Sequence, residues 1–226
     1  MFPLYDEETL SAKYRFVTLA LILVNIVVFF STAFSVDFES IIEIFGVTPG
    51  QVLSGSGLLT LFTSMFLHAD LVHLLGNMWF LWIFGDNVEG NLGPLKFILF
   101  YLTVGVVASL IDVYTASPER LGIPTIGASG AISGVLGGYV ILYPHNKIRT
   151  QFWAFFRPYV ISIPAYLYLG VWFLYQLVYI GTPTNIAYMA HIGGFVAGAI
   201  FILPLREKIL IVEKSITGGA KIEERY

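Results

Sequence analysis

The sequence predicts an all-α polytopic membrane protein, built as a bundle of six transmembrane helices. Three observations lead to this fold class. Hydrophobic residues make up 57% of the 226 residues. Charged residues make up only 12%, about half of the share in an ordinary soluble domain. No Asp, Glu, Lys or Arg occurs within 16–36, 121–146 or 158–205. Because a spanning helix needs about 20 apolar residues, the last stretch is long enough for two spans.

The boundaries of the six spans follow from these stretches and from turn signals. The stretch 158–205 must be divided once, and the run GTPTN at 181–185 is its only strong turn cluster. The segment before residue 16 is mixed in charge and has no small-residue cleavage site, so we expect a retained first helix rather than a signal peptide. Within a single domain over 1–226, the expected spans are 16–36, 72–84, 95–114, 129–143, 159–180 and 186–205.

The distribution of positive charge agrees with an even number of spans. If both termini are cytoplasmic, all of the twelve Lys and Arg residues except Arg120 fall on the inner side. The positive-inside rule predicts this bias, and an odd number of helices would abolish it. We therefore expect a multi-pass protein of the plasma (inner) membrane with both termini in the cytoplasm.

Composition and charge argue against several function classes. A net charge of −3 without a basic stripe gives no reason to expect a nucleic-acid partner. Without cysteine there is no disulfide, no Cys-ligated zinc and no cysteine nucleophile. No His-Glu-x-x-His run occurs, and Asp70 is the only carboxylate next to the histidines. We expect neither a metal site nor a cofactor, and the sequence does not predict an oligomeric state.

Two segments outside the spans have the pattern of membrane-surface elements. In the connection 37–67, apolar residues follow at i, i+3, i+4 and i+7 from Phe38 to Phe45, with acidic residues between them. This amphipathic pattern favours a helix partly embedded in the membrane surface. On the inner side, the aromatic residues of 152–156 precede Arg157, which is typical of an interfacial aromatic belt.

The polar residues of the expected spans lie at one depth. A polar group inside a membrane is costly and marks a candidate functional site. Here such groups lie near the start of the three spans that descend from the outer side, within roughly 10 Å of the boundary. We therefore expect a single site there. Its residues are His68, His73 and Asn77 before or in the second span, Ser129 and Ser133 in the fourth, and His191 in the sixth.

Two of these spans also carry small residues at four-residue spacing. Gly130 and Gly134 follow Ser129, and Gly194 and Gly198 follow His191. Such stripes let helix backbones approach closely, and helix packing alone would explain them. Packing does not explain the serine on one stripe and the histidine on the other. Serine needs an adjacent base to become a nucleophile, and neutral imidazole is such a base. Because no carboxylate lies at the depth of His191, a Ser–His dyad is favoured over a triad.

Acyl transfer also needs donors for a developing oxyanion. His73 and Asn77 are four residues apart and share one helix face, and the Ser129 N–H near a helix start adds a third donor. Hydrogen bonding between helices is the alternative role of His73 and Asn77. His68 is five residues before His73, about 140° round a helix, so we expect it to support a loop.

These residues resemble the motifs of the rhomboid family of intramembrane serine proteases. The matching patterns are His68-x4-His73-x3-Asn77, Gly127-Ala128-Ser129-Gly130, Ala190-His191-x2-Gly194-x3-Gly198, and Glu89-x3-Gly93 followed by Phe97 and Tyr101. The resemblance extends over about 16–205 and implies a six-helix core that cleaves transmembrane segments of other membrane proteins, in contact with membrane lipid.

The resemblance also implies roles for individual residues. Ser129 would be the nucleophile and His191 the general base and then acid, with His73, Asn77 and the Ser129 amide as the oxyanion hole. Gly127, Gly130, Gly194, Gly198 and His68 would support the site. The segment 181–185 would be a cap, and the fifth helix, with Trp172 and Phe173, would border lateral substrate access.

Two positions depart from the family pattern. Leu59 and Thr60 replace a Trp-Arg pair found in the first loop of many bacterial members, and Ser133 replaces a tyrosine that stacks on the histidine in some members. Orientation of His191 must therefore rely on another group. Two alternatives to a protease stay open: a catalytically silent relative that binds and routes membrane proteins, and a channel or transporter with a polar pocket.

Overall fold

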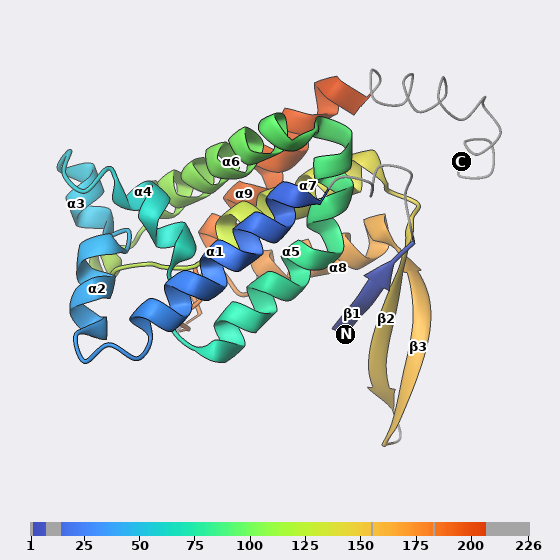
Figure 1. Cartoon of the computed structure of the whole chain (residues 1–226), viewed down its shortest axis with the longest axis horizontal. Coiled ribbons are helices and arrows are strands. Elements are labelled where there is room, and N and C mark those ends of the chain that lie inside the picture. Colours follow the sequence, from blue (N-terminus) through green and yellow to red (C-terminus); the bar gives the residue numbers. More distant parts are fainter. Residues whose placement is uncertain (1, 8–14, 155, 183, 207–226) are drawn as a thin grey trace.

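The computed structural model describes residues 2–7, 15–154, 156–182 and 184–206. Most of them lie in helices that run side by side (Figure 1). Lys13, Phe155 and the four basic residues beyond 206, which the sequence analysis used, lie outside the described residues. The main helices are α1 (Phe16–Thr32), α5 (Leu71–Leu92), α6 (Pro94–Tyr114), α7 (Ser129–Leu142), α8 (Ala165–Val178) and α9 (Tyr188–Ile202).

Helix α7 is the central element of the bundle. Eleven of its residues are buried, from Gly130 through Leu142, and it packs against α5, α6 and α9. Its 14 residues span roughly 21 Å at 1.5 Å per residue, less than the ~30 Å hydrocarbon layer. Its first residue, Ser129, is half-buried. A short central helix therefore places Ser129 within the bundle.

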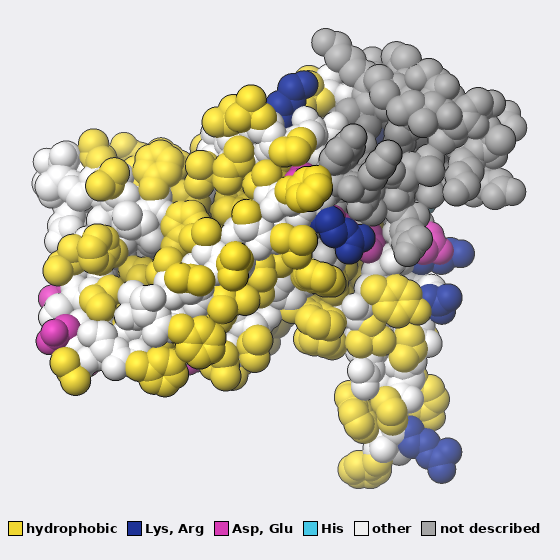
Figure 2. Space-filling view, in the orientation of Figure 1, with side chains coloured by type: hydrophobic (Ala, Val, Ile, Leu, Met, Phe, Trp, Pro, Cys, Tyr) yellow, Lys and Arg dark blue, Asp and Glu magenta, His cyan; other side chains and the backbone are white. Residues whose placement is uncertain are grey.

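Within the described residues, two helices are long and apolar enough to span a membrane by length and composition, Pro94–Tyr114 and Tyr188–Leu205. Three further apolar helices are shorter: Phe16–Thr32, Ser129–Leu142 and Ala165–Val178. Apolar side chains cover much of the bundle surface in Figure 2, and Val72, Leu95 and Val178 are each more than 70% exposed. The count of six spans stays a prediction.

An antiparallel three-stranded sheet corrects the all-α expectation. Its strands are β1 (Phe2–Asp6), β2 (Lys147–Ala154) and β3 (Arg157–Pro164), in the order β1-β2-β3. The hairpin of β2 and β3 projects from the end of the bundle (Figure 1). It contains the aromatic segment that was expected to form an interfacial belt.

The sheet also moves the start of the expected fifth span from residue 159 to Ala165, where α8 begins. The segment 159–164 belongs to β3 because its β-branched residues Val160, Ile161 and Ile163 favour extended backbone. Pro164 lacks the N–H that a helix interior needs. Hydropathy alone does not distinguish such a strand from a helix.

Two other span boundaries also differ from the expectation. The first helix ends at Thr32 rather than 36, and the second extends to Leu92 rather than 84. The extension carries the buried acid Glu89, whose carboxylate accepts hydrogen bonds from the backbone N–H groups of Val17 (2.9 Å) and Thr18 (2.8 Å) and from Thr18 Oγ1 (2.7 Å). These bonds satisfy donors at the start of α1 that have no partner within that helix. A charged residue thus continues α5 past the limit that hydropathy predicts.

The first connection contains the short helices α2 (Phe38–Phe45), α3 (Pro49–Leu53) and α4 (Thr60–Thr63), which lie together at the end of the bundle opposite the sheet (Figure 1). Thr63 Oγ1 donates to the carbonyl of Phe45 at 2.7 Å. The Thr60 hydroxyl donates to the carbonyl of Gly57 at 2.6 Å. These two bonds stabilise the first connection, in which Leu59 and Thr60 replace the Trp-Arg pair of many bacterial members.

Candidate active site

Ser129 is the first residue of α7, and the chain before it takes an unusual turn. Gly127 has φ +124°, a conformation that side chains disfavour. Its N–H donates to the carbonyl of Ser64 at 2.9 Å, which attaches the turn to the first connection. The N–H groups in the first turn of a helix have no acceptor within it. The Ser129 hydroxyl therefore lies beside N–H donors and the positive end of the helix dipole.

His191 reaches Ser129 because α7 and α9 pack backbone to backbone. A side chain at Gly194 would collide with the carbonyl oxygen of Gly130, and one at Gly198 with that of Gly134. Only glycine permits this approach. The structure brings His191 Nε2 to 2.8 Å from Ser129 Oγ, so an imidazole nitrogen can accept the hydroxyl proton directly.

The other ring nitrogen of His191 has a partner that the sequence analysis missed. His191 Nδ1 lies 2.8 Å from Oε1 of Gln176, which is buried in α8. The sequence search considered carboxylates only, although an amide within the uncharged stretch 158–205 was itself a signal. Two acids near this end of the bundle have other partners: Asp70 accepts from the His73 N–H at 2.8 Å, and Asp112 is paired with Arg120 at 3.1 Å.

His73 lies directly over the turn before Ser129. A Cβ added at Gly127 would lie 2.8 Å from both Cε1 and Nε2 of the His73 ring. The opposite nitrogen, Nδ1, accepts from the Ala69 N–H at 3.4 Å, which leaves Nε2 as the N–H donor of a neutral ring. A donor at this position faces the place where an oxyanion on a substrate bound at Ser129 would form.

Asn77 and His68 have other contacts. The Asn77 amide donates to the carbonyl of His73 at 3.0 Å, so one of its two N–H groups remains for a ligand. His68 is fully buried in the loop before α5, and its ring centroid lies 5.0 Å from that of His73. Burial lowers the pKa of His68 to about 4, with a smaller effect from His73. His68 is therefore neutral at physiological pH and packs behind His73.

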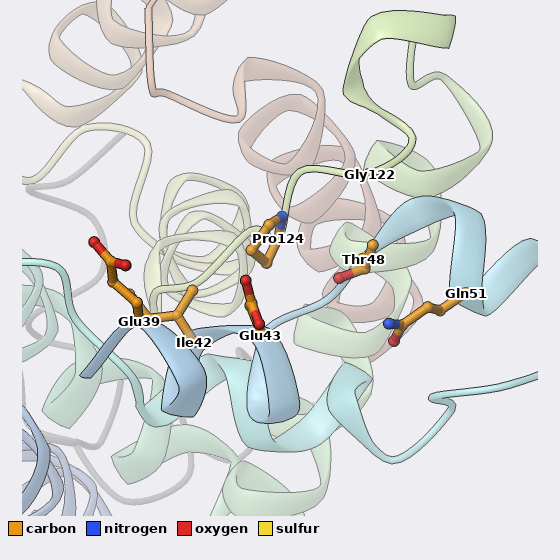
Figure 3. Close-up of a pocket in the computed structure, with 7 residues that line it drawn as sticks. All are labelled: Glu39, Ile42, Glu43, Thr48, Gln51, Gly122 and Pro124. Carbon is orange, nitrogen blue, oxygen red and sulfur yellow. The ribbon is translucent and has the colours of Figure 1, made fainter. Parts of the chain in front are cut away.

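The residues that the structure describes contain no group of three His, Cys, Asp or Glu side chains placed to hold a metal ion. An open pocket of about 390 Å³ lies away from Ser129, between α2, α3 and the loop at Gly122. Figure 3 shows Glu39 and Glu43 on its α2 side, across from Pro124. None of its lining residues belongs to the Ser129–His191 pair.

Comparison with known proteins assigns most of the chain to one family. The model of the Rhomboid domain matches residues 55–208. Rhomboid protein 1, mitochondrial, of Saccharomyces cerevisiae is 31% identical over 147 residues, which cover 61% of this chain and 39% of the yeast protein. RHOMBOID-like protein 12, mitochondrial, of Arabidopsis thaliana is 31% identical over 157 residues, which cover 62% and 44% of the two chains.

A third relative is the mouse presenilin-associated rhomboid-like protein, mitochondrial, which is 28% identical over 146 residues, 62% of this chain and 36% of the mouse protein. The chain thus spans less than half of the length of these relatives. All three are named as mitochondrial proteins, which contradicts the expectation of a plasma membrane. The charge bias used for that expectation decides which loops stay on one side, but it does not identify the membrane.

Proposed function

The chain belongs to the rhomboid family, and on that premise we propose that it is an intramembrane serine endopeptidase that cleaves transmembrane segments of other membrane proteins. The observation that carries the proposal is the 2.8 Å separation of Ser129 Oγ and His191 Nε2. Close packing of α7 and α9 at their glycines brings these two side chains together. A weakly nucleophilic hydroxyl next to an imidazole is the arrangement that nucleophilic catalysis needs.

In the proposed reaction, His191 Nε2 takes the Ser129 proton while Oγ attacks the carbonyl carbon of the scissile peptide bond. The carbonyl oxygen becomes an oxyanion, and the donors proposed for it are the Ser129 N–H, His73 Nε2 and the free N–H of Asn77. His191 then gives its proton to the leaving amine, and the acyl-enzyme forms. Water, deprotonated by His191, attacks the acyl-enzyme; the ester bond to Ser129 Oγ breaks, His191 returns the proton to Oγ, and the second product leaves.

We further propose the membrane arrangement that this reaction requires. Six spans form one domain, with α5, α7 and α9 bringing His73, Ser129 and His191 together at the end of the bundle that faces the first connection. A substrate segment enters beside α8, whose outward residues are exposed and apolar, among them Val171 and Leu174. No cofactor takes part. The proposed partners are transmembrane substrate proteins and the surrounding lipid.

The proposal is tested by reconstituting the full chain in liposomes with single-span substrate proteins that have a small residue before the cleavage position. The wild type is expected to cut within or next to the span, at a site located by mass spectrometry. Ser129→Ala and His191→Ala are expected to be inactive. Matched controls are Ser31→Ala and His145→Ala, which make the same changes at exposed positions outside the site and should keep wild-type activity.

A folded wild type that cuts none of the substrates would argue against the protease. It would favour a catalytically silent protein that binds membrane proteins. Cleavage that persists in Ser129→Ala would move the nucleophile elsewhere.

A further inference from the structure

We infer that Gln176 is a positioning residue of the proposed protease, which holds His191 in the tautomer and orientation that Ser129 needs. The inference rests on the proposed function and extends the Ser–His pair to three groups in line. Gln176 is 4% exposed, and its Oε1 lies 2.8 Å from His191 Nδ1. On the other side of the ring, Nε2 is 2.8 Å from Ser129 Oγ.

The backbone of α8 determines which end of the Gln176 amide faces His191. Nε2 of the amide donates to the carbonyl oxygen of Trp172, one turn earlier, at 3.2 Å. A flipped amide would place two acceptors against each other at that carbonyl. The amide oxygen therefore faces the histidine, and it can only accept. His191 must then carry its proton on Nδ1, which leaves Nε2 unprotonated.

This tautomer is the one that a general base requires. Nε2 can accept the Ser129 proton only when it has no proton of its own. Without the Gln176 acceptor, nothing on Nδ1 would select this tautomer, and a ring protonated on Nε2 would point a donor at Ser129. Two aromatic rings also lie beside His191: the centroids of Trp172 and Tyr188 are 6.1 Å and 6.5 Å from that of His191. They restrict the ring but offer no comparable acceptor to Nδ1.

A neutral amide suits this position inside a membrane protein. A carboxylate would accept the same hydrogen bond, but burying its charge away from water is costly. The nearby acid Asp112 is already bound by Arg120 and Thr125. Gln176 also fills the role that the sequence analysis left open when Ser133 replaced a stacking tyrosine. The Ser133 hydroxyl itself donates to the carbonyl of Ser129 at 2.7 Å.

The test compares Gln176→Met, which keeps the length but loses the acceptor, with Gln176→Glu, which keeps it. For each variant, kcat and KM of substrate cleavage are measured from pH 5 to 9, together with the thermal unfolding midpoint. We expect Gln176→Met to lower kcat about tenfold or more, the value of one buried hydrogen bond, with KM unchanged. Gln176→Glu should retain most of kcat and move the acidic limb of the pH profile to higher pH.

A second readout does not depend on activity. In the Ser129→Ala background, the ¹⁵N chemical shifts of His191 report which ring nitrogen carries the proton. We expect the Nδ1–H form with Gln176 and a mixture of both tautomers with Gln176→Met. The His191 signals are identified by their loss in His191→Ala.

The inference is overturned if Gln176→Met keeps the wild-type kcat and the Nδ1–H tautomer. It is also overturned if folded Gln176→Glu loses as much activity as Gln176→Met without any pH shift, because Gln176 would then only fill space. Both results leave the proposed protease intact as long as the wild type cleaves. A folded wild type that cleaves no substrate refutes the protease itself, and the catalytic part of the inference with it.

Discussion

Replacing Gly194 by alanine tests whether the contact between α7 and α9 sets the distance between Ser129 and His191. The new Cβ would overlap the carbonyl oxygen of Gly130 and would lie 3.1 Å from its carbonyl carbon and 3.3 Å from Cβ of Ser133. Two of these atoms belong to the backbone and cannot rotate away. A carbon normally approaches a carbonyl oxygen to about 3.3 Å, so the helices must separate by roughly 1 Å or more.

This separation acts directly on the site, because Gly130 follows Ser129 and Gly194 lies one turn after His191. A misplacement of about 1 Å can cost about 100-fold in rate, and overpacking costs about 1–3 kcal/mol of stability. We expect Gly194→Ala to lose about 100-fold in cleavage activity in liposomes. In a thermal unfolding assay, the variant should still be folded.

The matched control is Gly170→Ala in α8, where nothing lies within 4 Å of the added Cβ. It should keep wild-type activity and gain up to about 1 kcal/mol of stability. A Gly194→Ala variant as active as Gly170→Ala would refute the reasoning, since the distance between the two residues would then not depend on this helix contact.

Three further predictions concern the opposite end of the bundle. Glu89→Ala removes three hydrogen bonds to a buried carboxylate and should lower the free energy of unfolding by about 3 kcal/mol or more. Thr18→Val removes only one of these bonds and should lower it by about 1–2 kcal/mol. Equal effects of the two variants on unfolding in micelles would contradict this assignment. Burial and, to a lesser extent, Asp86 raise the pKa of Asp6 to about 7, against the lowering effect of its hydrogen bond with Tyr139. Because the folded state binds the Asp6 proton more tightly than the unfolded state, this proton's contribution to stability is complete below about pH 4 and is lost as the pH rises through about 7. Asp6→Asn should flatten this part of the plot of stability against pH. An unchanged slope in Asp6→Asn would contradict the prediction. Trp153, 69% exposed on the hairpin, should be quenched by lipids brominated near the headgroup; a quenching profile identical in Trp153→Phe would rule out that lipid contact.

The sequence predicted the family, and it named Ser129 and His191, which the structure places within hydrogen-bond distance. Uncharged stretches and turn signals located the main helices approximately, because desolvation cost governs where charge can lie. The glycine stripes predicted a close approach of two helices, and the structure has it at Gly130 and Gly194. The family assignment is confirmed by the Rhomboid domain match over 55–208.

Hydropathy predicted the wrong element or the wrong boundary where pairing between distant segments determines the structure. The segment 159–164 is apolar, but pairing with β2 makes it a strand. Conversely, α5 continues through Asp86 and Glu89 because these acids have partners: Arg15 lies 3.3 Å from Asp86, and the start of α1 binds Glu89. Neither kind of tertiary pairing leaves a periodic signal in the chain.

The partner of the histidine left only a weak signal in the sequence, an amide within an uncharged stretch. A lone glutamine in an apolar stretch has many possible roles, and its contact with His191 depends on how α8 is rotated against α9. The sequence analysis predicted that some group other than the tyrosine must orient His191. Only the packing of the helices identified Gln176 as the group.

The most direct test of the central claim is covalent labelling of Ser129. The folded wild type is treated with a fluorophosphonate in detergent, and the adduct is located by peptide mass spectrometry. The proposal predicts one adduct on Ser129 in the wild type and none on Ser129 in His191→Ala. An adduct on a different serine, or labelling of Ser129 that is undiminished in His191→Ala, would contradict the claim that His191 activates this hydroxyl.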